Sequence, residues 1–288
     1  MLPRSMFIIL VVTMLVTMGC GFTFTIPVSD VKTGPTVIEE VEVPIPEGAE
    51  VVDLTFGFGA GEMRLSPGDE NLLVRGTATY NVDDFKPDII TSGDSVRINT
   101  GDLELKGFPN FAEQLVNEWN FELAPVPMNL RVEAGAYQGR MELGGLALES
   151  LRVIGGASEV KLVFSEPNLI PMSLLRYDTG ASSVTLEGLA NANFDKMRFE
   201  GGAGEFSLDF SGELQRDATI TVDAGLSSVK IIVPRGINAK VFFDGGLSNV
   251  DVQGNWEKVG NVYSTSGDGP RLTINVNLGA GNLELLNR

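Results

Sequence analysis

The sequence predicts an all-β fold in which strands stack on one another, as a β-solenoid or a closely related stacked-strand architecture, with one short helix. A recurring glycine pattern and regularly spaced apolar residues around it lead to this prediction. The pattern is Gly, then Ala or Leu, then Gly, Ser or Tyr. Its reference glycines are Gly59, Gly135, Gly156, Gly180, Gly202, Gly225, Gly246 and Gly279.

Apolar residues occupy fixed positions around each reference glycine. They lie five and three residues before it and six residues after it, as Met197, Phe199 and Leu208 do around Gly202. In the copy around Gly135 we place the last of these at Leu143. Alternation on both sides of the glycine indicates two short strands per copy, each with one face turned inward.

The spacing of the copies favours stacking. From Gly135 to Gly246 the reference glycines are 21, 24, 22, 23 and 21 residues apart. One copy cannot bury its apolar face alone, but copies stacked about 4.8 Å apart can. We therefore interpret the glycine as a corner between two strands, where a small residue permits positive φ and close stacking.

The N-terminus resembles a bacterial lipoprotein signal. Arg4 precedes an apolar run from Met6 to Met18, and Cys20 follows Gly19. We expect residues 1–19 to be removed as a signal peptide, Cys20 to be lipidated, and residues 20–37 to form a tether. An uncut membrane anchor and an incidental cysteine remain alternatives.

Composition excludes several classes of function. The chain has no histidine and one cysteine, which excludes His-based catalytic triads, the usual zinc sites and a disulfide within the chain. Its net charge is −17, and it becomes −18 without residues 1–19, which hold one arginine and no acid. Nucleic acid and anionic lipid headgroups are therefore not expected partners.

Residues 38–128 read as an N-terminal β domain of short strands and Pro/Gly turns. Within it we expect a short helix near residues 110–119, because Phe111, Leu115 and Trp119 are four apart and Asn110 and Glu113 form a capping pair. Residues 129–288 are the predicted solenoid, with an enlarged loop at residues 253–270.

Several segments resemble the toast-rack domain family of bacterial envelope proteins, which is related to adhesin-like stacked β-strand repeats. They are "FGAGEMRLSPGDENLLVRGTATYN", "FKPDI", "NEWNFELAPVPMNLRVEAGA" and "LRVIGGASEVKL". The resemblance covers most of residues 45–165, and the later repeats look like the solenoid of the same group. It implies a stacked β architecture at the cell surface and no catalytic residues.

Glycine-rich stretches such as "FEGGAGEFSLDF" do not indicate a nucleotide site. A β-alternating run follows the glycines where a dinucleotide site needs a helix. A calcium β-roll would need Asp at position 206, where this chain has Phe206. We therefore expect no nucleotide, cofactor or resident metal.

Acidic residues recur two positions before the reference glycine, and arginines recur four positions before it. The acids are Glu133, Asp178, Glu200, Asp223 and Asp244, with Ile154 between the first two; the arginines are Arg131, Arg152, Arg176 and Arg198. We expect a solvated surface ladder in which the arginines compensate the carboxylates. Weak binding of divalent cations or of a polymer by Asp178, Glu200, Asp223 and Asp244 is the alternative.

The loop at residues 253–270 contains Trp256 and Tyr263, the only Trp or Tyr after Tyr177. These rings can cover the open end of the solenoid, which we favour. Alternatively, they can form a sugar-stacking surface.

No enzyme is expected. The acids recur with the repeat, and the turn serines, such as Ser182, have no histidine to activate them. The sequence therefore favours a lipid-anchored, non-catalytic envelope protein at the bacterial cell surface or in the periplasm. We expect it to act as a scaffold, or as an adhesin-like or envelope-stress-associated interaction surface, for a protein or polysaccharide partner. A lipoprotein that binds cell-wall or extracellular polysaccharide is the main alternative, and a carbohydrate-active β-helix enzyme is a weaker one.

Overall fold

The computed structural model describes residues 28–29, 33–100, 108–109 and 115–288. The chain divides into two units, one with residues 1–32 and 104–113 and the other with residues 33–103 and 114–288. In the first unit, β1 (Val28–Ser29) pairs in parallel with β7 (Phe108–Pro109). All other described elements belong to the second unit.

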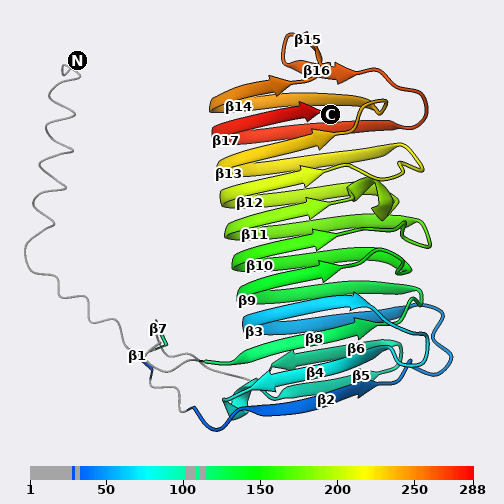
Figure 1. Cartoon of the computed structure of the whole chain (residues 1–288), viewed down its shortest axis with the longest axis vertical. Helices are drawn as coiled ribbons and strands as arrows, with labels where there is room; N and C mark the ends of the chain where they lie inside the picture. Colours follow the sequence, from blue (N-terminus) through cyan, green and yellow to red (C-terminus); the bar gives the residue numbers. More distant parts are fainter. Residues whose placement is uncertain (1–27, 30–32, 101–107, 110–114) are drawn as a thin grey trace, which may run out of the picture. The chain divides into compact units, whose positions relative to one another are not determined.

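The second unit is built on one sheet of 15 strands (Figure 1). The long strands are β3 (Val52–Pro67), β9 (Met128–Glu142), β10 (Leu148–Val163), β11 (Met172–Glu187), β12 (Phe194–Asp209), β13 (Ala218–Val233), β14 (Asn238–Gln253) and β17 (Arg271–Asn287). The short strands are β2 (Val37–Val43), β4 (Val74–Tyr80), β5 (Pro87–Ser92), β6 (Ser95–Thr100), β8 (Asn117–Leu123), β15 (Glu257–Val259) and β16 (Val262–Thr265). The 3-10 turns are η1 (Asp83–Phe85) and η2 (Leu189–Ala192).

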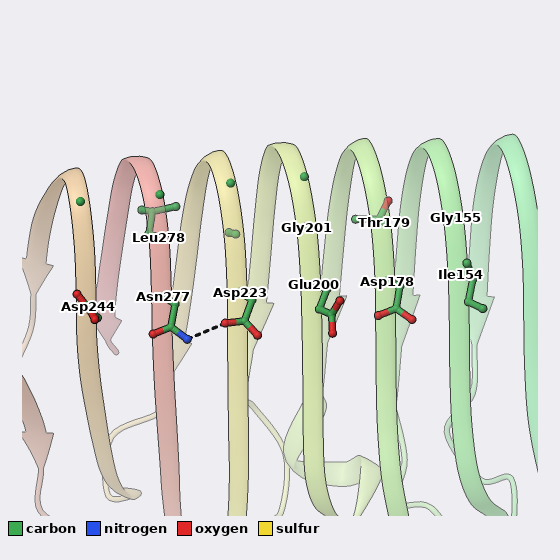
Figure 2. A pocket seen from close by; sticks show the side chains of 15 residues that line it. Ile154, Gly155, Asp178, Thr179, Glu200, Gly201, Asp223, Asp244, Asn277 and Leu278 are labelled. Carbon is green, nitrogen blue, oxygen red and sulfur yellow. Dashed lines mark hydrogen bonds between the residues drawn. The ribbon is translucent and has the colours of Figure 1, made fainter.

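Each long strand has a first arm before its reference glycine and a second arm after it. The strands drawn in Figure 2 turn over near the labelled Thr179, Gly201 and Leu278, each of which directly precedes a reference glycine. Alternate side chains of both arms point inward. In β12, Met197 and Phe199 of the first arm and Phe206 and Leu208 of the second are all buried. The core therefore lies between the two layers of arms.

The reference glycines stack in one column, as the repeat predicts. The register pairs Gly201 with Ala224 and Ala203 with Leu226, which aligns Gly202 with Gly225 between them. A Cβ on Gly202 would lie 2.8 Å from the carbonyl oxygen of Gly180 on the neighbouring strand. Close approach of the backbones therefore explains these glycines.

Positive φ does not explain the reference glycines, in contrast to our expectation. None of the eight has it. Positive φ occurs two residues later, at Gly61, Gly204 and Gly281, in three of the strands. The copy around Gly135 also needs no shift to Leu143, because Met141 pairs with Leu65 on one side and Leu162 on the other.

The order of strands in space departs from their order in the chain at one point. β17, the last strand, lies between β13 and β14 and pairs in parallel with both. Gly279 therefore stacks between Gly225 and Gly246. As a result β14, and not the C-terminal strand, is the last long strand of the stack.

One sheet runs through both predicted domains, because β3 pairs with β9. β6 adds to the first arm of β3, and β8 adds to its second arm. β5 pairs with β6, and β4 and β2 follow β8, all in antiparallel pairings.

The predicted helix near residues 110–119 is wrong in its described part. Asn117–Leu123 form strand β8, whose side chains alternate between buried and exposed. Trp119 points into the core, where its ring lies 4.9 Å from that of Phe58 and 5.3 Å from that of Phe121. The period of two in Trp119, Phe121 and Leu123 prevails over the period of four. Residues 110–114 lie outside the described residues.

Candidate functional site

The acidic and arginine columns lie next to each other on the outer face of the first arms. Asp178, Glu200 and Asp223 are direct register partners on β11, β12 and β13. Arg176 and Arg198 are register partners two residues earlier. Stacking of parallel strands in register thus brings together residues that are more than 20 positions apart in the chain.

The two columns form a zigzag of ion pairs. The Arg176 guanidinium lies 2.8 Å from Asp178 on its own strand and 3.3 Å from Glu200 on the next. Arg198 repeats this geometry, 2.5 Å from Glu200 and 3.8 Å from Asp223. Each of these arginines therefore bridges two strands, and Glu200 is shared by both.

The zigzag has a second segment beyond Ile154. Glu133 accepts hydrogen bonds from Arg131 on its own strand and lies 3.5 Å from Arg97 of β6. The hydrogen bond from Arg131 lowers the pKa of the Glu133 carboxyl, against the opposing effect of its partial burial. In the same way, the hydrogen bond to Asp178 raises the pKa of the Arg176 guanidinium.

The far end of the acidic column differs from the predicted ladder. Asp223 and Asp244 are not neighbours, because β17 places Asn277 between them. The Asn277 amide donates a hydrogen bond of 2.6 Å to Asp223. A neutral amide therefore separates two carboxylates that the chain order would have stacked.

A shallow groove of about 740 Å³ follows the acidic column across the strands (Figure 2). Glycines of the turn, including Gly201, Gly202 and Gly225, lie along it. The four predicted ligand residues on this face line it: Asp178, Glu200, Asp223 and Asp244. The sequence thus identified the acids of the groove, but not Asn277.

Carboxylates of the groove are engaged by neighbouring side chains. The carboxylates that line the groove between Ile154 and Asn277 are paired with arginines or with the Asn277 amide. Within residues 33–100 and 115–288, no group of three or more acidic, His or Cys side chains is arranged to hold a metal ion. Alternating charges in this arrangement stabilise the stacking of neighbouring strands.

Of the two aromatic residues of the 253–270 segment, Tyr263 is the more deeply buried. The segment forms a hairpin of β15 and β16, and β16 pairs with the first arm of β14. Tyr263 lies opposite Val241, is 2% exposed and has the Lys258 ammonium 5.0 Å from its ring centre. Its ring covers the end of the core. Trp256 is partly exposed.

Ser182 and Ser227, both buried, are part of the turn. The Ser182 hydroxyl lies 2.9 Å from that of Ser158 and 2.6 Å from that of Thr179. The Ser182–Ser158 contact connects β11 with β10, and the Ser182–Thr179 contact lies within β11.

Sequence reasoning missed a second depression, of about 760 Å³, on the outer face of the second arms. Arg64, Arg140 and Lys161 stack in register there. Arg64 pairs with a glutamate on its own strand and Lys161 with one on the next strand. The recurrence of a basic residue five positions after Gly59, Gly135 and Gly156 would have revealed this column.

Cys20 and the predicted signal peptide lie outside the described residues. In the described part of the chain, no helix has the length and apolar character needed to cross a membrane.

Comparison with solved structures identifies a similar fold. The chain is 19% identical to a protein described as a "putative cell adhesion protein" from Clostridium sporogenes, with a TM-score of 0.52, over 88% of this chain and 100% of the other. A "putative adhesin" from Bacteroides fragilis is 8% identical over 90% of this chain and 100% of the other, with a TM-score of 0.34. A comparison with curated proteins finds no match.

The sequence comparison identifies a similar family. Residues 30–169 match the family described as "N-terminal domain of toast_rack, DUF2154". The matched segment contains β3, β9 and β10, which are the first long strands of the stack, and β11 to β14 and β17 extend the same sheet. Over residues 30–169 this chain is therefore similar to the toast-rack N-terminal domain family.

Proposed function

We propose that the protein is a non-catalytic, lipid-anchored component of the bacterial cell envelope. Its stacked sheet would act as a scaffold or adhesin-like interaction surface, at the cell surface or in the periplasm. The observation that supports this most is the match of residues 30–169 to the toast-rack N-terminal domain family, continued by a stack of long strands. The resemblance of the fold to that of a "putative cell adhesion protein" points in the same direction.

The charged face supports a framework in preference to an enzyme. Acid–base catalysis by two carboxylates requires environments that separate their pKa values. Here Asp178 and Glu200 share the same arginine and occupy equivalent positions on neighbouring strands. The repeat thus gives these two acids similar surroundings.

Anchoring is tested with the full chain in a bacterial host. Metabolic labelling with a fatty acid and membrane fractionation should show label and protein in the membrane fraction. The Cys20→Ala variant should lose the label. Retention of label by that variant would exclude Cys20 as the anchor. Adhesion of expressing cells to extracellular or cell-wall material, compared with cells that lack the protein, then tests the interaction role.

A polysaccharide-binding role is the second candidate, because a groove of about 740 Å³ lined by carboxylates and turn glycines runs across the strands. Trp256 offers a partly exposed ring at one end of the sheet. Binding of the full chain to a glycan array, lost in Trp256→Ala or in Asp178→Asn, would favour this function. Binding unaffected by both variants would exclude these residues as the site.

A further inference from the structure

The two arms of β14 end differently at the edge of the sheet. The first arm is covered from Ala239 to Phe242 by β16, and the Phe243 N–H donates to the Asn261 carbonyl. The second arm, residues 247–253, pairs with β17 on one side. Within residues 33–100 and 115–288, no strand pairs with its other side. The sheet therefore ends in a step. Two further strands continue it beside the first arm, and no described strand continues it beside the second arm.

The open arm leaves core positions uncovered. Val252 is 41% exposed, whereas Leu285, its register partner on β17, is 0% exposed. Leu247, at the turn, is 87% exposed. Residues 247–253, LSNVDVQ, contain no Lys, Arg or Pro, the residues that commonly protect an edge strand from pairing.

The open arm also lacks the opposite charge that a neighbouring strand supplies inside the stack. The Lys230 ammonium of β13 lies 2.9 Å from the Glu284 carboxylate of β17. Asp251 is the next residue in this row, paired in register with Glu284. It accepts a hydrogen bond from Asn249, and in the described part of the chain it has no cationic partner. A cation on one further strand would complete the row.

We propose that the second arm of β14 is a docking edge for an extended strand of a partner polypeptide. That strand would carry apolar residues at alternate positions, against Val250 and Val252, and Lys or Arg opposite Asp251. Its backbone would extend the sheet by one strand, as in β-strand addition. The proposal gives the interaction scaffold proposed above a class of partner. It rests on that proposed function only for its biological setting.

A second copy of this chain does not fit the same edge. Two second arms joined edge to edge would lie about 5 Å apart. The hairpin of each copy adds two strands to its first arm beside this edge. The four hairpin strands of the two copies would need about 20 Å, but the joined edges would leave no room for them, so the hairpins would collide. A single strand avoids this collision.

The probe is a synthetic peptide, LSSVKIIV, which copies residues 226–233. Inside the protein this segment pairs with β17, with Lys230 opposite Glu284 and Ile231 opposite Leu285. Its fluorescently labelled form is titrated with the full chain and binding is followed by anisotropy. The matched control is LSSVEIIV, in which the lysine is replaced by glutamate.

We expect LSSVKIIV to bind at least about fivefold more tightly than LSSVEIIV, because opposite charges attract and like charges repel across paired strands. The Asp251→Lys variant should reverse this preference, and its melting temperature should match that of the parent because Asp251 is exposed. Val252→Lys should weaken both peptides.

Three results would overturn the proposal. They are equal affinity for the two peptides, no binding of either, and a concentration-dependent dimer of the full chain that Asp251→Lys abolishes. Loss of envelope anchoring in cells would contradict the proposed function but would leave peptide binding in solution intact, so the two failures can be distinguished.

Discussion

Asn277 of β17 donates a hydrogen bond of 2.6 Å to Asp223 of β13, and it stands between Asp223 and Asp244 in the stack. This contact follows from the placement of the last strand between two earlier ones. It replaces what would have been a direct pair of carboxylates by an amide and a carboxylate.

Replacing Asn277 by aspartate should therefore destabilise the protein. Five acids would then be consecutive on neighbouring strands, and like charges opposite each other on paired strands cost up to about 1 kcal/mol per contact. We expect Asn277→Asp to lower the melting temperature, most at low salt. Asn275→Asp is the control, because its neighbours are Thr221 and Phe242. Equal effects of both variants would contradict the assigned order of the strands.

The glycine column should tolerate a methyl group at its β3 end, at Gly59, but not within the stack. A Cβ on Gly202 would lie 2.8 Å from the Gly180 carbonyl oxygen, whereas one on Gly59 has only the Thr100 hydroxyl at 3.5 Å. We expect Gly202→Ala to cost about 1–3 kcal/mol of the free energy of unfolding, by overpacking. Gly59→Ala should cost much less. Denaturant unfolding of the two variants measures this, and an equal loss would show that close stacking is not the reason for the glycine.

The zigzag should contribute stability that depends on salt. Arg176→Gln removes contacts to both Asp178 and Glu200, at the place where the arginine bridges two strands. Because these groups are partly exposed, the expected loss is about 1 kcal/mol at low salt and less at high salt. Lys196→Gln, which alters a residue without an ion pair in the described part, is the control. A loss unaffected by salt would speak against an electrostatic role.

Alkaline pH should destabilise the fold through two core tyrosines. Burial raises the pKa of Tyr137 to about 12, and that of Tyr177 rises well above its usual value for the same main reason. Below the unfolded value of about 10 the stability is complete, and it should fall as the pH rises from about 10 to about 12, by up to about 3 kcal/mol for Tyr137. Tyr137→Phe should flatten this fall in unfolding experiments. An unchanged pH profile would contradict the assignment.

The repeat predicted much of the fold, because the close approach of neighbouring backbones requires a glycine in each copy, and these glycines recur regularly in the sequence. It could not predict the order of the last two long strands. The inward residues Ile274, Val276 and Leu285 of β17 are as apolar as Val241, Phe243 and Val252 of β14, so either strand fits next to β13. Only the three-dimensional pairing distinguishes them.

The candidate site was likewise predicted only in part. Spacing from the glycine found the acids and arginines, since strands in register convert equal spacing into a column. It did not find Asn277, because an amide at the same position has no charge to attract attention. The helix expected near Trp119 failed because two spacings, four and two, were both present and the strand pairing of β8 decided between them.

The central claim is that the acidic column is part of an ion-paired framework and not a cation site. Thermal unfolding of the full chain with and without millimolar calcium tests it most directly, with Asp223→Asn/Asp244→Asn as the comparison. We predict no rise of the melting temperature with calcium in either protein, because Asp223 is engaged by Arg198 and Asn277 and is separated from Asp244. A calcium-dependent rise in the parent that the double variant abolishes would contradict the account.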